Sequence, residues 1–246
     1  MQQPVVAENQ LIPYEVSPLP PGPWLVFAPH ADDETFGMGG SLAKASEQGL
    51  DTHVLIVTDG ALGGDAPDLI KVRQREAREA TDLLGVNTLQ WWSEPDRGLV
   101  HSSRVLQKIA QLIAELAPAS VFFPGLLELH PDHRMTAQLV WAALQSLDAP
   151  PAAFAYEICV QSPVNRLIDI SAQRAIKAQA MAVYVSQNGQ NNYPELVQAL
   201  NTTRTFTLAA SVRQAEGLFE FTPQQLTGAL HDVTRKVIEM YRIPGE

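Results

Sequence analysis

Residues 24–34 read Trp24-Leu25-Val26-Phe27-Ala28-Pro29-His30-Ala31-Asp32-Asp33-Glu34, a continuous apolar run that ends in one imidazole and three carboxylates. A continuous run, rather than an alternating one, is typical of a parallel strand that is covered on both faces. We therefore expect a buried strand over Trp24 to Ala28 and a helix over Glu34 to Gln48, where Gly49 is placed to end it.

The rest of the chain repeats this alternation of strand and helix. Further strands are expected at residues 52–58, 88–92, 119–124, 154–160 and 166–170, the last two as an antiparallel extension of the sheet. Further helices are expected at residues 68–84, 103–116, 135–147, 172–185, 193–208 and 222–241. This order favours an α/β fold with a Rossmann-like, doubly wound, mostly parallel sheet that has helices on both faces.

The chain divides into an arm, one large domain and a terminal helix. Residues 1–23 are rich in proline and predict an extended arm laid over the surface, with a simple flexible leader as the alternative. Residues 24–221 are expected to form one domain, because a chain of 246 residues with 46% hydrophobic content can bury a substantial core. Residues 222–246 predict a C-terminal helix packed on the same domain, which serves as a cap or in a homo-oligomer.

Composition excludes several classes of protein. The net charge of -10 comes without a cluster of Lys and Arg, which argues against a nucleic-acid partner. No apolar stretch reaches the roughly 20 residues of a membrane span, and Met1 to Gln10 lacks the features of a secretory signal, so we expect a cytoplasmic protein. Cys159 is the single cysteine, which excludes an intrachain disulfide, and we expect it to be buried in an apolar strand.

A second cluster of metal-binding residue types follows the strand expected at residues 119–124. It reads Glu128-Leu129-His130-Pro131-Asp132-His133-Arg134. In doubly wound sheets ligands bind beyond the carboxyl ends of the strands, where both clusters fall. A catalytic zinc typically keeps three protein ligands and one open position, and His30, Asp33 and His133 could supply them. His and Asp ligands also admit another divalent metal.

The remaining acidic and imidazole groups suggest roles in hydrolysis of an amide. Asp32 lies beside a ligand and is the candidate general base, which takes a proton from water and passes it to the leaving amine. His130, as an imidazolium, could stabilise the oxyanion or donate a proton. Asp132 is expected to orient a histidine.

The pair His30-Ala31-Asp32-Asp33-Glu34 and His130-Pro131-Asp132-His133 resembles the two signatures of the LmbE-like, PIG-L-type zinc N-deacetylases. The resemblance runs from about Trp24 to Phe219 and departs from the family pattern at Ala31, where proline is usual, and at Tyr184, where many members have histidine. Weaker similarities are Asp59-Gly60, Val72 to Glu76, Leu84 to Val86, Ser186-Gln187 and Ala215 to Phe219.

The resemblance implies removal of an N-acetyl group from an N-acetylglucosamine-containing or related amino-sugar substrate by one zinc ion per chain. It implies His30, Asp33 and His133 as ligands, Asp32 as general base, His130 as the oxyanion-stabilising residue and Arg73 as a substrate contact. The part of the substrate beyond the amine would contact loops around residues 59–67 and 94–101.

Two alternatives stay open. One is an amidase that cleaves a larger N-acyl group from a similar amine, which the same ligands would serve. The other is a non-catalytic Rossmann-type module that binds a nucleotide or sugar nucleotide at Gly37 to Gly40, although these glycines lack the spacing of a dinucleotide loop.

Overall fold

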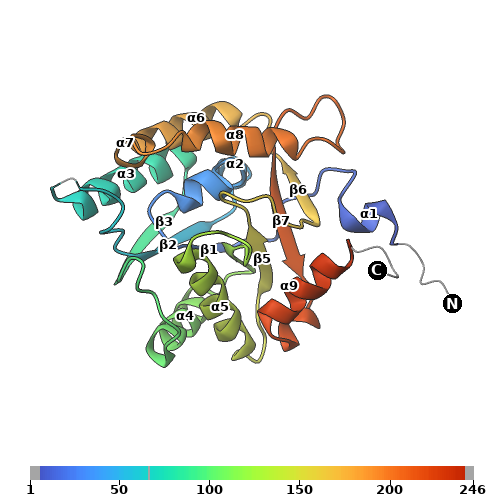
Figure 1. Cartoon of the computed structure of the whole chain (residues 1–246), viewed down its shortest axis with the longest axis horizontal. Coiled ribbons are helices and arrows are strands. Elements are labelled where there is room, and N and C mark those ends of the chain that lie inside the picture. The colour runs from blue at the N-terminus through green and yellow to red at the C-terminus, as the bar shows by residue number, and fades with distance from the viewer. Residues whose placement is uncertain (1–5, 66, 242–246) are drawn as a thin grey trace.

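The computed structural model describes residues 6–65 and 67–241. Within these residues a seven-stranded sheet has the order β3-β2-β1-β4-β5-β7-β6 (Figure 1). Strands β1 to β5 are parallel, and β7 is antiparallel to both β5 and β6. The expected mostly parallel, Rossmann-like sheet is confirmed. The strands are β1 Trp24–Ala28, β2 Thr52–Thr58, β3 Thr88–Glu94, β4 Ser120–Pro124, β5 Ala152–Tyr156, β6 Arg166–Asp169 and β7 Ala215–Phe221.

Helices cover both faces of the sheet. Helices α2, α3, α6 and α8 lie over one face, and α4, α5 and α9 lie over the other (Figure 1). Each layer of helices packs on its own apolar cluster, one containing Phe122 and the other Phe123. The helices are α1 Glu8–Leu11, α2 Asp33–Glu47, α3 Leu69–Leu84, α4 Ser103–Leu116, α5 Pro131–Gln145, α6 Arg174–Val183, α7 Val185–Asn188, α8 Tyr193–Thr203 and α9 Leu230–Glu239, with a 3-10 turn at Gln225–Thr227.

The central strands are buried on both faces, as their continuous apolar sequences predict. All five residues of β1 and of β4 are buried. Side chains on opposite faces of β4 pack separately: the Phe122 ring stacks on Phe154, and the Phe123 ring meets the edge of Trp141. The two strands that precede the polar clusters are therefore held firmly between two layers of helices.

The structure corrects several expected boundaries. Helix α5 begins at Pro131 rather than residue 135, because proline suits the first helical position and the His130 side chain caps the helix. Strand β5 ends at Tyr156, is parallel to β4 and does not pair with β6, since the unexpected strand β7 lies between them. The expected helix at residues 193–208 ends at Thr203, and the one at residues 222–241 is divided around Gly228 into the 3-10 turn and α9.

The two ends of the described chain pack on this domain. Ser17 N–H donates to Leu167 O at 2.8 Å, and Leu167 N–H donates to the Ser17 hydroxyl at 3.1 Å, so the arm lies beside β6. Leu230 and Val233 of α9 join the cluster beneath α5. Residues 1–5 of the expected arm, Ala66 and residues 242–246 lie outside the described residues. None of the described helices is long and apolar enough to cross a bilayer.

Candidate active site

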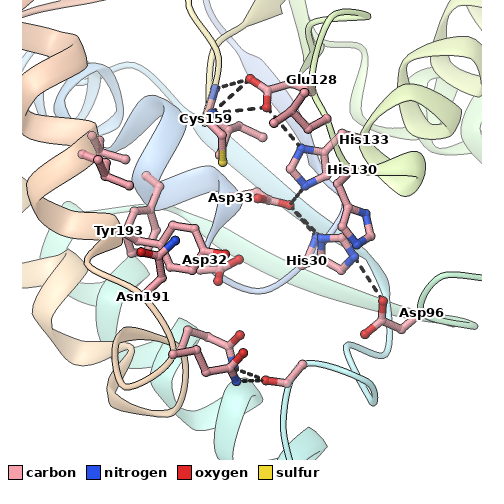
Figure 2. Close-up of a pocket in the computed structure, with 18 of the residues that line it drawn as sticks. His30, Asp32, Asp33, Asp96, Glu128, His130, His133, Cys159, Asn191 and Tyr193 are labelled. Carbon is pink, nitrogen blue, oxygen red and sulfur yellow. Dashed lines mark hydrogen bonds and ion pairs between the residues drawn. The ribbon is translucent and has the colours of Figure 1, made fainter.

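The two polar clusters meet where the strand order reverses direction. Strands β1 and β4 are parallel neighbours, although the connection of β1 leads to β2 and that of β4 leads to β5. Ligands bind at such a switch point, beyond the carboxyl ends of the strands. His30 follows β1, and His130 is the N-cap of α5, which follows β4. Their rings lie 4.6 Å apart between centroids, at the cavity shown in Figure 2.

Asp33 joins the two clusters. Its Oδ2 atom lies 3.2 Å from His30 Nδ1 and 3.2 Å from His133 Nε2, and all three residues are buried. Burial alone would raise the pKa of the Asp33 carboxyl, but His133 and His30 outweigh burial and hold that pKa well below its usual range. Two imidazole nitrogens, each 3.2 Å from one carboxylate oxygen, are ligand types that suit a tetrahedral zinc with bonds of about 2.0–2.1 Å. These residues therefore fit a metal ion.

Each of these two histidines also has a carboxylate near its other ring nitrogen, the one that does not face Asp33. His30 Nε2 lies 3.2 Å from Asp132 Oδ2 and 3.4 Å from Asp96 Oδ1, and His133 Nδ1 lies 3.6 Å from Glu128 Oε2. Such partners fix the orientation of metal-binding imidazoles. Two other sets of possible donors converge among the described residues: His30 with His130 and His133, and His30 with Asp96, His130 and Asp132. The sequence reasoning gave Asp132 an orienting role but assigned none to Asp96 or Glu128.

Asp32 lies next to these donors with an unusual backbone. Its φ angle is 144°, a region that side-chain-bearing residues rarely adopt. The Asp32 N–H donates to Glu34 Oε2 at 3.2 Å, and its carboxylate faces the cavity. Burial raises the pKa of Asp32 to about 7, with Arg73 opposing the shift. A carboxyl group of this kind can both accept and release a proton near neutral pH.

Arg73 braces the same turn. Its guanidinium donates to Ala31 O at 3.0 Å and to Gly60 O at 3.2 Å, and it lies 3.5 Å from Asp32 Oδ1. The side chain is buried and lines the cavity, and Nε has no hydrogen-bond partner among the described residues. The structure therefore places Arg73 at the cavity beside Asp32, where two of its nitrogens bind backbone carbonyls and Nε has no partner among the described residues.

The neighbours of His130 define its donor atom. His130 Nδ1 accepts a hydrogen bond from the Asp132 N–H at 3.2 Å, which assigns the ring proton of a neutral imidazole to Nε2. Burial, together with His30 and His133, lowers the pKa of His130. This shift favours the neutral ring over the imidazolium, and a neutral ring with this hydrogen bond donates from Nε2.

Tyr184 stands at the position where many members of the similar family have histidine, and its phenol is buried. Its hydroxyl donates to Glu34 Oε1 and lies 3.3 Å from the Thr35 hydroxyl, and both Tyr184 and Glu34 are fully buried. Glu34 in turn accepts the Asp32 N–H. Tyr184 is therefore linked to the turn that carries Asp32 by the Glu34 carboxylate, which accepts hydrogen bonds from both residues.

The cavity has a volume of about 590 Å³ and walls that the sequence reasoning largely missed. Helices α7 and α8 contribute Gln187, Tyr193, Leu196, Val197 and Leu200, and the segment after β5 contributes Ile158 and Cys159. The expectation that Cys159 is buried in a strand is wrong, since β5 ends three residues earlier and Cys159 is exposed at the cavity. The predicted loops do reach the site through Gly63, Asp96 and Arg97.

Gly37, Gly39 and Gly40 are packed in the protein interior and do not form a ligand-binding loop. They lie within α2 and are buried. A Cβ atom at Gly37 would lie 2.5 Å from the Tyr156 ring, and one at Gly40 would lie 2.7 Å from Ile170. Since neighbouring side chains fill the space, a nucleotide has no access to these glycines, and the alternative of a nucleotide-binding module at this position is wrong.

Comparison with known proteins agrees with this geometry. Residues 25–144 match the family model described as PIG-L, GlcNAc-PI de-N-acetylase. Diacetylchitobiose deacetylase of Thermococcus kodakarensis is 27% identical over 221 residues, which cover 79% of this chain and 81% of that protein. A probable N-acetyl-alpha-D-glucosaminyl L-malate deacetylase 2 of Bacillus anthracis is 30% identical over 138 residues, 50% of this chain and 59% of that protein.

Among solved structures, the conserved protein TT1542 from Thermus thermophilus superimposes with a TM-score of 0.73 at 30% identity. The match covers 81% of this chain and 94% of that one. The residues matched by the family model, 25–144, include both polar clusters. The chain therefore belongs to the PIG-L, or LmbE-like, family of deacetylases.

Proposed function

We propose that this protein is a zinc-dependent hydrolase that removes the N-acetyl group from an N-acetylglucosamine-containing or related amino-sugar substrate. The observation that carries the proposal is the convergence of His30 Nδ1 and His133 Nε2 on Asp33 Oδ2, beside the carboxylate of Asp32. The relatives named above act on N-acetylated sugars by their names, which supports this substrate class.

His30, Asp33 and His133 would hold one zinc ion per chain. When bound, zinc supplies Lewis acidity, which polarises an amide carbonyl and makes water more acidic. Asp32 takes a proton from the attacking water as its oxygen bonds to the carbonyl carbon. When the C–N bond breaks, Asp32 returns that proton to the amine, so acetate and a free amino sugar leave.

Two neighbours would support this reaction. His130 donates from Nε2 to the oxygen that gains negative charge, because its Nδ1 is already occupied by the Asp132 N–H. Asp132 holds His30 through Nε2 and so leaves Nδ1 for the metal. Arg73 lines the cavity, where it would contact the substrate, and it holds the turn of Asp32 through its hydrogen bond to Ala31 O.

The proposal is tested by acetate release from a panel of N-acetylated amino sugars, with zinc-loaded wild-type protein beside Asp32→Ala. Release by the wild type alone is expected. Equal release by both proteins would contradict Asp32 as base, and no release from any sugar by a zinc-loaded wild type would contradict the substrate class.

Metal titration distinguishes the three sets of donors. If His30, Asp33 and His133 are the ligands, His133→Ala loses the single tightly bound zinc while His130→Ala keeps it. The reverse result would assign the metal to the group of His30, Asp96, His130 and Asp132. Loss of zinc from both His133→Ala and His130→Ala would assign the metal to His30, His130 and His133.

A further inference from the structure

The cavity has two walls of opposite character. Its polar wall comes from the loops after β2 and β3 and from the end of α7, and consists of Gly63, Asp96, Arg97, Gln187, Gln190 and Asn191. Its apolar wall comes from α8 and from the segments before α5 and after β5, and consists of Leu129, Ile158, Cys159, Leu196, Val197 and Leu200. A cavity of about 590 Å³ is in the range that holds a drug-sized ligand, so it has room for more than one small ring.

The apolar wall is accessible and regular. Leu196 and Leu200 are four residues apart on α8 and so lie on one side of the helix, next to Val197. Leu196 is 51% exposed and Leu129 is 75% exposed, so both side chains are open to a ligand in the cavity. The Cys159 thiol belongs to the same wall: desolvation and nearby carboxylates raise its pKa to about 12, so it stays neutral.

Asp96 of the polar wall and Cys159 of the apolar wall lie on opposite sides of the proposed metal-binding residues (Figure 2). On one side Asp96 contacts His30. On the other side Glu128 faces His133 and accepts hydrogen bonds from the N–H groups of Ile158 at 2.7 Å and Cys159 at 3.1 Å. Figure 2 accordingly shows Asp96 and Cys159 on either side of Asp33. A carbonyl placed at these residues would therefore have Asp96 of the polar wall on one side and Ile158 and Cys159 of the apolar wall on the other.

The chemistry of the substituents assigns each to a wall. The amine side carries a sugar whose hydroxyls need hydrogen-bond partners, which the polar wall provides. We propose that the acyl group lies on the apolar wall, and that the enzyme hydrolyses straight-chain N-acyl amino sugars longer than the acetyl compound. This inference rests on the proposed function: water adds to the same carbonyl carbon, the same C–N bond breaks, and a longer carboxylate leaves.

The test is a series of N-acetyl-, N-butanoyl-, N-hexanoyl- and N-octanoylglucosamine, with amine release measured on the zinc-loaded full chain. We expect kcat/KM to rise about twofold to fourfold per methylene, since full burial of one methylene contributes about 0.8 kcal/mol. Leu196→Asn should flatten the series. Leu83→Asn changes an exposed leucine of α3 outside the cavity and should leave the slope unchanged.

Binding provides a second readout. Calorimetry with Asp32→Ala should show N-octanoylglucosamine binding more tightly than the acetyl compound, with a more negative heat-capacity change. Cleavage of the acetyl compound without a gain for longer chains would overturn the inference and leave the proposed function intact. A gain for the octyl glycoside of N-acetylglucosamine alone would assign the apolar wall to the opposite end of the substrate. Failure to cleave any member would overturn both.

Discussion

Replacing Gly40 by alanine tests whether the glycines of α2 are there for packing. The new Cβ atom would lie 2.7 Å from Cβ, Cγ2 and Cδ1 of Ile170. At this distance either helix α2 or the segment at the end of β6 must shift. Overpacking of this kind costs about 1–3 kcal/mol. Alanine is favoured over glycine in a helix by about 1 kcal/mol, which partly hides the cost.

Gly39→Ala is the matched control. Its Cβ atom would lie 3.3 Å from Lys177 Cγ, a contact that needs a shift of only a few tenths of an ångström, and it gains the same helix propensity. The difference between the two variants therefore isolates packing, and Gly40→Ala should be less stable than Gly39→Ala by about 1–3 kcal/mol.

Urea unfolding measures that difference if both variants keep the wild-type m-value. In a chain of this size each kcal/mol corresponds to a difference of about 2–4 °C in Tm. The double variant Gly40→Ala with Ile170→Ala should show coupling, because it removes two of the three clashing atoms, Cγ2 and Cδ1, and leaves only the Cβ contact. Equal stability of the two single variants, or additivity in the double variant, would refute the packing account.

Three further changes have defined outcomes. Asp33→Ala should abolish stoichiometric zinc binding measured by equilibrium dialysis, because Asp33 Oδ2 faces both His30 and His133; retained stoichiometry would contradict the ligand assignment. Lys177→Met should lower the free energy of unfolding by about 3–5 kcal/mol, because it leaves Glu216, 1% exposed, without its cation at 2.6 Å; an unchanged urea midpoint would argue against a charged pair. Tyr184→Phe should lower the free energy of unfolding by about 1.5–3 kcal/mol, because the buried Glu34 loses a hydrogen bond. It should also reduce kcat more than it raises KM, since Glu34 then holds Asp32 less firmly, and a change in KM alone would contradict this.

Strands and the position of the site could be predicted because their signals are local. The apolar runs before His30 and near residue 120 end in clusters of ligand-type residues, and parallel strands bring such clusters to one edge. Asp96 and Glu128 could not be assigned roles in this way, because their partners His30 and His133 are neighbours only in the folded chain.

Other differences arise where tertiary packing outweighs sequence patterns. Strand β7 contains Gly217 and two glutamates, so its pattern is weak, yet Glu216 is buried because Lys177 and the N–H groups of Gly40 and Ser41 satisfy it. Cys159 follows an apolar run but leaves the sheet after Tyr156. The start of α5 did have a local signal, since proline at position 131 is favoured at a first helical residue.

The contact between Ser17 and Leu167 has a consequence for self-association. Strand β6 is the last strand of the sheet, and the unpaired N–H and C=O groups of a terminal strand are a template for another chain. Ser17 occupies both groups of Leu167, and the prolines at 18 and 20 lack the N–H needed to continue the ladder. The arm thus ends the sheet as well as covering it, and removal of the arm would open a site for intermolecular β-pairing.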